Sequence, residues 1–356
     1  MFFIARVVAA LGLMTAAASA SAGTVVYVSN ADSQEISVLS LDRASGAVAP
    51  LQTLPVGGSV MPLALSPDRK LLYAALRSQP YRVATLAVEN DGRLRKLGEA
   101  PLADSMPYIA TDRSGHWLFA ASYGGHKISV NAIGKDGQVG AVQQLLSTAP
   151  NAHSIQADTA NRFVLATHLG GDNVSVWRFD AEKGLLSPNE PPHVSTPAKS
   201  GPRHLRLDAR QRYAYLLCEL DATLHVFSYD AQQGRLGEIQ SLSVLPPGFS
   251  GKPWAADLQL TPDGRYLYAS ERGSHTLAAF KVDAERGTVQ PLGHTPTEKT
   301  PRGFAIDPSG RWLLAVGQES HGMSVYAIDA GSGALRQVQQ LALGKNPNWV
   351  EIVDLP

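Results

Sequence analysis

Short apolar runs with alternating polar positions recur along the chain after residue 22. Stretches such as 128–133 and 174–179 place apolar side chains at every second residue, which is the period of a half-buried β-strand. No long stretch shows the 3.6-residue period of an amphipathic helix. The pattern therefore predicts an all-β protein built from many short strands.

One apolar strand recurs at a regular spacing and defines a repeat. Its third residue falls, in successive copies, at Tyr27, Tyr73, Phe119, Leu165, Tyr215, Tyr268 and Leu314. A second marker, the glycine of a polar turn, falls at Gly46, Gly92, Gly137, Gly184, Gly234, Gly287 and Gly333. Both markers are spaced by about 46 residues and lengthen together in the same two units. Because two independent markers recur seven times with the same spacing, the chain is predicted to contain seven copies of one module.

Each module has room for four short strands, which is the signature of a propeller blade. We therefore predict an all-β, seven-bladed β-propeller with four-stranded antiparallel blades. The first strand, 25–28, matches the second strand of a blade, and the last, 349–353, matches a first strand. The N- and C-terminal strands are thus predicted to share one blade, which closes the ring and removes the exposed sheet edges of an open array.

The N-terminus has the features of an export signal. Arg6 precedes a short apolar run, and Ala20-Ser21-Ala22 is a small-x-small cleavage site. We predict a signal peptide over 1–22, a single propeller domain over 23–356 and a periplasmic location, with an uncleaved anchor as the alternative. No other stretch is long and apolar enough to cross a bilayer, so no membrane contact is expected after cleavage.

Composition narrows the class of partner. Lys and Arg total 31 and Asp and Glu total 31, so no basic excess points to nucleic acid. The single cysteine, Cys218, excludes an internal disulfide. The sequence contains no serine-nucleophile elbow, zinc-protease motif or phosphate-binding loop. We expect a small-molecule substrate, no metal, and a monomer or weak dimer.

Aligning the modules brings polar residues to one end of the central channel. Counting from the proline, or its equivalent, before each first strand gives a ring of Leu63, Tyr108, His153, Arg203, Trp254, Arg302 and Asn348. Counting from the second strand gives a facing ring that includes Arg77, Tyr123, Leu169, Glu219, Arg272 and Gln318. Ionisable groups that converge on a concave site are costly unless they are paired or used, so this mouth is the candidate site.

One hairpin illustrates the geometry. Arg203 begins one predicted strand and Glu219 follows its antiparallel neighbour, so both lie at the same end of the hairpin. A plain salt bridge that ties the two strands together is the structural alternative for this pair. His204 and His321 are expected near the same face and are candidate pocket residues.

Several ordered motifs resemble those of the bacterial propeller-type 6-phosphogluconolactonases, a group related to the fungal carboxymuconate lactonizing enzymes. The matching stretches are Asn151-Ala152-His153-Ser154, Gly201-Pro202-Arg203-His204, Cys218-Glu219-Leu220, Trp254-Ala255-Ala256-Asp257 and Pro301-Arg302-Gly303-Phe304. The resemblance implies a seven-bladed propeller that acts on a lactone without a cofactor. It also implies a catalytic set of His153, Arg203, Glu219 and Arg302. Around that set we predict substrate-binding roles for His204, Trp254, Gln318, His321, Tyr123 and Arg272.

These residues suit lactone hydrolysis by general acid–base attack of water. We predict Glu219 as the base for water and His153 as the acid for the leaving oxygen, with exchanged roles left open. Arg302 and Arg203 would hold the oxyanion or an anionic substituent. The expected substrate is a sugar-acid 1,5-lactone, either 6-phosphorylated or, given the export signal, unphosphorylated. A lactone-forming cyclase and a non-catalytic binding propeller are the alternatives.

Overall fold

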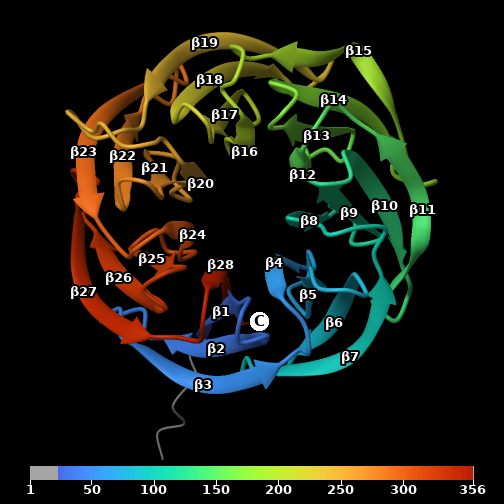
Figure 1. Ribbon diagram of the computed structural model, residues 1–356, viewed down its shortest axis with the longest axis horizontal. Coiled ribbons are helices and arrows are strands. Elements are labelled where there is room, and N and C mark those ends of the chain that lie inside the picture. Colours follow the sequence, from blue (N-terminus) through green and yellow to red (C-terminus); the bar gives the residue numbers. More distant parts are fainter. Residues whose placement is uncertain (1–22, 356) are drawn as a thin grey trace, which may run out of the picture.

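A computed structural model describes residues 23–355, and the predicted signal peptide at 1–22 lies outside the described residues. Seven four-stranded antiparallel sheets surround a central channel (Figure 1). This arrangement confirms the predicted seven-bladed propeller. The described residues contain no helix, and so none that could cross a membrane.

Each blade runs from an innermost strand at the channel to an outermost strand at the rim. Blade 1 comprises β28 (Pro347–Asp354), β1 (Thr24–Asn30), β2 (Glu35–Leu41) and β3 (Val48–Pro55), in that order. In the same order, blades 2 to 4 comprise β4 (Val60–Leu65), β5 (Leu71–Leu76), β6 (Arg82–Val88) and β7 (Leu94–Pro101); β8 (Tyr108–Thr111), β9 (Trp117–Ser122), β10 (Lys127–Ile133) and β11 (Val139–Ser147); and β12 (Ala152–Ala157), β13 (Phe163–His168), β14 (Asn173–Asp180) and β15 (Leu185–Ser195). Blades 5 to 7 comprise β16 (Pro202–Leu207), β17 (Tyr213–Cys218), β18 (Thr223–Asp230) and β19 (Arg235–Ser243); β20 (Ala255–Leu260), β21 (Tyr266–Glu271), β22 (Thr276–Val282) and β23 (Val289–Pro296); and β24 (Pro301–Ile306), β25 (Trp312–Gly317), β26 (Gly322–Ile328) and β27 (Leu335–Ala342).

The two ends of the chain close the ring. β28 pairs with β1 in an antiparallel register that runs from Thr24 opposite Asp354 to Asn30 opposite Pro347. Figure 1 shows β28 as the innermost strand of the blade that β1, β2 and β3 complete. The predicted sharing of one blade by the terminal strands is therefore confirmed.

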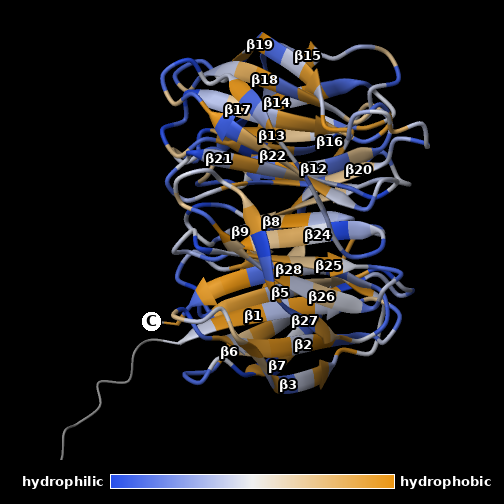
Figure 2. Ribbon diagram, turned by 90° about the vertical axis from the view of Figure 1, so that its left-hand side faces the viewer, coloured by the Kyte–Doolittle hydropathy of each residue, from blue (hydrophilic) through white to orange (hydrophobic). Residues whose placement is uncertain are grey.

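The hydrophobic core lies between adjacent blades. One cluster joins Val26 and Leu39 of blade 1 to Leu314 and Val325 of blade 7, so apolar packing also spans the point of closure. Burial of such side chains contributes roughly 1.5 to 3 kcal/mol each. The side view in Figure 2 shows hydrophobic residues concentrated on the strands and hydrophilic residues on the loops at the two faces.

The glycine marker has a packing role. Gly46 adopts a φ of 78°, and a β-carbon there would collide with the Trp312 ring of blade 7. Gly184 of blade 4 meets Trp117 of blade 3 in the same way. Each of these turns thus needs glycine both for its left-handed backbone and for its close approach to the neighbouring blade. The repeat is regular because this contact recurs between blades.

Candidate active site

A β-bulge at the start of several innermost strands positions the candidate side chains. In β16 the pairing with β17 shifts between Pro202 and His204, which leaves Arg203 as the extra residue. The same shift isolates His153 in β12 and Arg302 in β24. A bulge leaves one residue unpaired and re-aims its side chain. Three of the predicted catalytic residues therefore share one backbone device in blades 4, 5 and 7.

The strand pairing corrects three members of the ring predicted by counting from prolines. Tyr108 pairs with Ala121 just as His204 pairs with Leu217, so Tyr108 is equivalent to His204 and not to Arg203. In blades 2 and 6 the irregular segments lie between Val60 and Leu63 and between Ala255 and Leu258. Leu63 and Trp254 therefore lie outside the bulges, whereas Asn348 lies within the corresponding shift of β28.

The facing ring is positioned by equivalent backbone hydrogen bonds. The backbone N–H of Glu219 donates to the carbonyl of Gly201 at 2.7 Å, and that of Arg272 donates to Trp254 at 3.0 Å. Gln318 and Arg77 make the same bond to Thr300 and Ser59, respectively. The loop after the second strand of each of these blades is thus held beside the loop before its first strand, as the repeat alignment predicts.

Glu219 is the acidic centre of the mouth. Its Oε2 accepts a hydrogen bond from Nε of Arg203 and forms an ion pair with Nη2 of Arg272, each at 2.8 Å. The two guanidiniums are almost fully buried, each with 1% of its side chain exposed, while Glu219 keeps 14%. Burial by itself raises the pKa of Glu219, but Arg203, Arg272 and Arg302 outweigh it and lower that pKa. The carboxylate is therefore ionised at neutral pH.

Arg302 adds positive charge without an acidic partner of its own. Within residues 23–355 no carboxylate forms an ion pair with it. Burial and the charges of Arg203, Arg272 and Arg77 lower the pKa of Arg302. Arg77 is held nearby by a 2.9 Å hydrogen bond from its Nε to Ser105. Four guanidiniums around one carboxylate form a site that favours an anion or a developing oxyanion.

His153 is an imidazole at the mouth with a ring nitrogen that is not used in a hydrogen bond among the described residues. Its side chain is buried, and Nδ1 has no hydrogen-bond partner among the described residues. The ring lies edge-on to Tyr123, with centroids 6.1 Å apart, and 5.3 Å from the ring of His204. Burial first, then the charges of Arg203, His204 and Arg302, hold the pKa of His153 well below its usual value. The imidazole is neutral at physiological pH, and its unpartnered nitrogen is unusual for a buried polar atom.

A cluster of aromatic rings lies next to these groups in the central channel. Tyr108 packs edge-on against His204 at 5.3 Å and against Trp349 at 5.2 Å. These three residues stand at one equivalent position, one residue beyond the bulge site, in blades 3, 5 and 1. His204 therefore belongs to this aromatic cluster and follows Arg203 directly in β16. Trp349 was not among the predicted site residues, and Tyr108 was placed in the ring of the mouth without a predicted role; their shared repeat position with His204 is the signal that identifies both.

The other predicted binding residues lie around the edge of the mouth of the central channel. Trp254 is 40% exposed and stacks on the Arg272 guanidinium, whose carbon lies 4.0 Å from the ring centroid. Tyr123 is 37% exposed. Gln318 donates to Oδ1 of Asn346 at 2.7 Å. Trp254 and Tyr123 thus present aromatic surface beside the charged groups, whereas Gln318 is engaged with a neighbouring loop.

His321 has a contact that recurs at equivalent turns. Its Nδ1 accepts a hydrogen bond from the backbone N–H of Asn346 at 3.1 Å. His126 accepts from Asn151 and His275 accepts from Thr300 in the same manner. All three histidines have positive φ values, between 52° and 57°. This contact ties successive blade loops together and leaves His321 outside the charged cluster around Glu219.

No group of three or more His, Cys, Asp or Glu side chains with metal-binding geometry occurs in residues 23–355. The Cys218 thiol, also within this range, is buried, and burial raises its pKa to about 12. The side chains gathered at the mouth are therefore a neutral imidazole, one carboxylate and several guanidiniums.

Comparison with known proteins places the chain among lactone-acting propellers. Residues 21–352 match the family described as "Lactonase, 7-bladed beta-propeller". A 6-phosphogluconolactonase of Pectobacterium carotovorum is 39% identical over 331 residues, covering 93% of this chain and 99% of the relative. One from Serratia proteamaculans is 39% identical and covers 92% and 98%, respectively. The solved structure of the periplasmic gluconolactonase of Pseudomonas aeruginosa has a TM-score of 0.88 at 29% identity, covering 94% of this chain and all of that one.

Proposed function

We propose that this chain, which belongs to the family of seven-bladed β-propeller lactonases, hydrolyses the ring ester of a sugar-acid 1,5-lactone. The observation that carries this proposal is the neutral, unpartnered His153 beside a cluster of arginines, of which Arg203 and Arg272 pair with Glu219 and Arg302 pairs with no carboxylate in residues 23–355. Ester hydrolysis needs a base for water and a cationic site for the oxyanion, and both are present at the mouth.

His153 is the better base of the two candidates. Its ring nitrogen Nδ1 is free of partners among the described residues, whereas Oε2 of Glu219 already accepts from two arginines. Because the lowered pKa of His153 keeps the ring unprotonated, it suits proton removal from water before it suits proton donation. These features favour the exchanged form of the roles predicted from sequence, with Glu219 holding Arg203 and Arg272 in place.

In the proposed hydrolysis, His153 carries one proton from the attacking water to the leaving ring oxygen. His153 takes a proton from water as the water oxygen bonds to the lactone carbonyl carbon. The oxyanion that forms is stabilised by the guanidiniums of Arg302 and Arg272. Collapse of this intermediate breaks the bond from the carbonyl carbon to the ring oxygen. The ring oxygen receives the proton from His153, which gives an open-chain hydroxy acid and a neutral imidazole.

The aromatic side chains and the positive charge at the mouth indicate which class of lactone would bind there. Trp254 and Tyr123 offer aromatic faces for a sugar ring, and Arg302 and Arg77 have no carboxylate partners in residues 23–355. This excess charge supports binding of an anionic lactone such as the 6-phosphate. The predicted export signal and the similarity to a periplasmic gluconolactonase support the unphosphorylated lactone and a periplasmic location.

A pH-stat assay of residues 23–356 tests the proposal. Acid release would be measured on glucono-1,5-lactone and on its 6-phosphate, each corrected for spontaneous hydrolysis. Acceleration of either by the protein is the expected result, and the ratio of kcat/KM for the two identifies the preferred substrate. Absence of acceleration on both would overturn hydrolysis of sugar-acid lactones as the function.

A further inference from the structure

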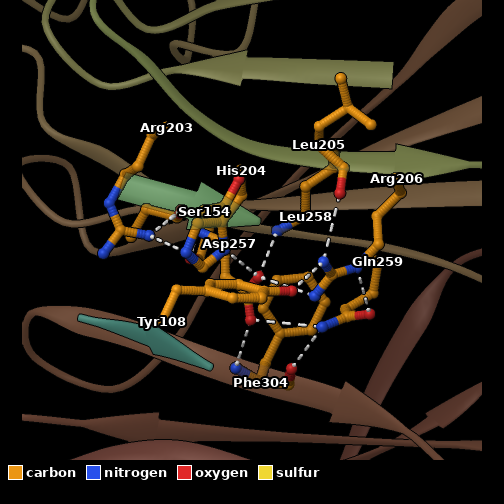
Figure 3. A network of polar contacts seen from close by, with 12 residues as sticks. Tyr108, Ser154, Arg203, His204, Leu205, Arg206, Asp257, Leu258, Gln259 and Phe304 are labelled. Carbon is orange, nitrogen blue, oxygen red and sulfur yellow. Dashed lines mark hydrogen bonds and ion pairs between the residues drawn. The ribbon is translucent and has the colours of Figure 1, made fainter. Parts of the chain in front are cut away.

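A buried chain of polar side chains supports Arg203 from behind (Figure 3). Nη1 of Arg203 lies 3.1 Å from Nε2 of His204, and Nδ1 of the same ring lies 2.8 Å from Oδ1 of Asp257. Arg203, His204 and Asp257 are 1%, 2% and 7% exposed, so the chain is shielded from water. It links the catalytic mouth in blade 5 to a carboxylate in blade 6.

The direction of each hydrogen bond follows from the groups involved. An arginine can only donate, so Nε2 of His204 must accept and carry no proton. The ring proton therefore resides on Nδ1 and is donated to Asp257. Burial and the charge of Arg203 lower the pKa of His204 to about 3, which agrees with a neutral ring. The order Asp257, His204, Arg203 thus defines one tautomer of the histidine.

Asp257 is itself fixed in place. Its Oδ1 also accepts from the backbone N–H of Leu258 at 2.8 Å, and its own N–H donates to Ser270 at 3.0 Å. Oδ2 accepts from the side chain of Gln259 at 3.3 Å. Although burial raises the pKa of Asp257, the hydrogen bond from His204 and the charges nearby lower it to about 2. The carboxylate is therefore a permanent, oriented acceptor.

We infer that Asp257 is a positioning residue for the reaction, because it fixes the His204 tautomer that holds the Arg203 guanidinium against Glu219. If Asp257 were neutral, the ring proton would be free to move to Nε2. Two donors would then face each other at 3.1 Å, and the guanidinium would turn away from this contact. This inference rests on the proposed lactonase function for its effect on rate, but not for its effect on the tautomer.

Asp257→Asn is the direct kinetic test. Supporting side chains of this kind typically contribute 10- to 100-fold, so we expect kcat on glucono-1,5-lactone or its 6-phosphate to fall about 10- to 100-fold. KM should change by less than about threefold, because Trp254 and Arg302 remain in place. The matched control is Asp112→Asn, the same change at a fully buried aspartate whose Oδ1 accepts from the backbone of His116 and Trp117. It should lower the melting temperature and leave kcat within about threefold. An Asp257→Asn kcat that also stays within threefold would overturn the inference.

Nitrogen NMR of the ¹⁵N-histidine-labelled wild-type protein tests the tautomer without any variant. The His204 signals, identified by their loss in His204→Gln, should show a protonated Nδ1 and a bare Nε2 between pH 5 and pH 8. Folded Asp257→Asn should show proton occupancy at Nε2. A wild-type ring that is protonated at Nε2, or an imidazolium at pH 7, would overturn the inference even if Asp257→Asn failed to fold. This readout remains decisive if the protein acts on neither lactone, so the two proposals fail separately.

Discussion

The two ends of the central channel are lined by the same seven strands but differ in how their charges are paired. At the mouth, Arg203 and Arg272 pair with the single carboxylate of Glu219, Arg302 and Arg77 have no carboxylate partner in the described residues, and His153 has a nitrogen without a partner there. At the far end, Arg206 donates to Tyr108 at 2.9 Å and to Gln259 at 3.2 Å, and lies 3.7 Å from Asp257. Arg206 at the far end is thus paired with polar and acidic neighbours, whereas the arginines of the mouth leave an excess of positive charge that suits an anionic ligand.

Cavity size points in the other direction. A cavity of about 270 Å³ at the far end is lined by Tyr108, Arg206, Trp349 and Glu351, and one of about 160 Å³ lies beside it. Neither is lined by His153, Arg203 or Glu219. Unsatisfied polar groups and empty volume therefore mark opposite ends of the channel, and the two criteria lead to different predictions for substitutions at each end.

The largest expected effect is that of His153→Gln, which removes the base at the mouth while keeping a polar side chain. We expect kcat to fall at least about 100-fold, because proton transfer typically contributes 10²- to 10⁴-fold. The measurement is initial rate in the pH-stat assay. Gln156→Ala, a change at the far end, is the control and should stay within about threefold. If His153→Gln and wild type had equal rates, His153 would not be the base, and the mouth would lose the main feature that sets it apart from the far end.

Glu219→Gln should cause the second-largest fall in kcat. It leaves Arg203 and Arg272 without their shared counter-charge, so both guanidiniums lose a charge-assisted hydrogen bond. We expect kcat to fall roughly 30- to 100-fold, with a shift in the acid limb of the pH profile because the mouth becomes more positive and lowers the pKa of His153 further. Steady-state kinetics from pH 4 to pH 8 measures both. An unshifted acid limb would show that Glu219 does not act on His153 electrostatically.

Arg302→Met should have a smaller effect that depends on substrate charge. Methionine keeps much of the apolar stem and removes the guanidinium. We expect kcat to fall about tenfold on both lactones, and KM to rise about tenfold more for the 6-phosphate than for the unphosphorylated compound. The comparison of the two substrates within one variant serves as its own control. If KM changed equally for the two lactones, Arg302 would have no role in binding the phosphate, and only its role in stabilising the oxyanion would remain.

The smallest effect on activity is expected at Glu351 of the far end. Burial raises the pKa of its carboxyl to about 7, against an ordinary value near 4.5. The folded protein therefore binds more protons than the unfolded chain between these values, and stability falls as pH rises through this window. Glu351→Gln should remove this loss and raise the free energy of unfolding at pH 8 by about 1 to 3 kcal/mol, as measured by urea titration at pH 5 and pH 8. Activity should remain within twofold, and a larger loss would mean that the two ends are coupled.

The blade count was predictable from sequence because its markers are local. Gly46 and its equivalents meet steric demands that recur from blade to blade, so they keep a fixed spacing. The bulge residues were predictable where the preceding proline recurs at the same place, as in Pro202-Arg203 and Pro301-Arg302, and also at His153, where Ala152 takes the place of the proline. In blade 2 the proline used for counting, Pro62, lies inside the irregular segment, so the count gave Leu63, two residues after Met61, which is the position equivalent to Arg203.

The support behind Arg203 was not predictable from local sequence. His204 and Asp257 come from strands in different blades, and their contact depends on how the innermost strands β16 and β20 approach each other. The motif Trp254-Ala255-Ala256-Asp257 contributes to the family resemblance, but motif spacing carries no information on inter-blade pairing. Only the three-dimensional arrangement identifies the partner, because it lies across the blade interface.

The shared bulge has a consequence for how such sites change over evolution and in engineering. A register shift is a property of the backbone, so the side chain it displays can be exchanged while strand pairing and the inter-blade core are retained. In blades 2 and 6 the residues that directly follow the last paired position, and so correspond to Arg203, are Met61 and Ala256, which carry no ionisable group. Met61 is partly exposed and is the position at which a single substitution would add an acid, base or cation beside the existing polar cluster, whereas Ala256 is fully buried and suits only small side chains.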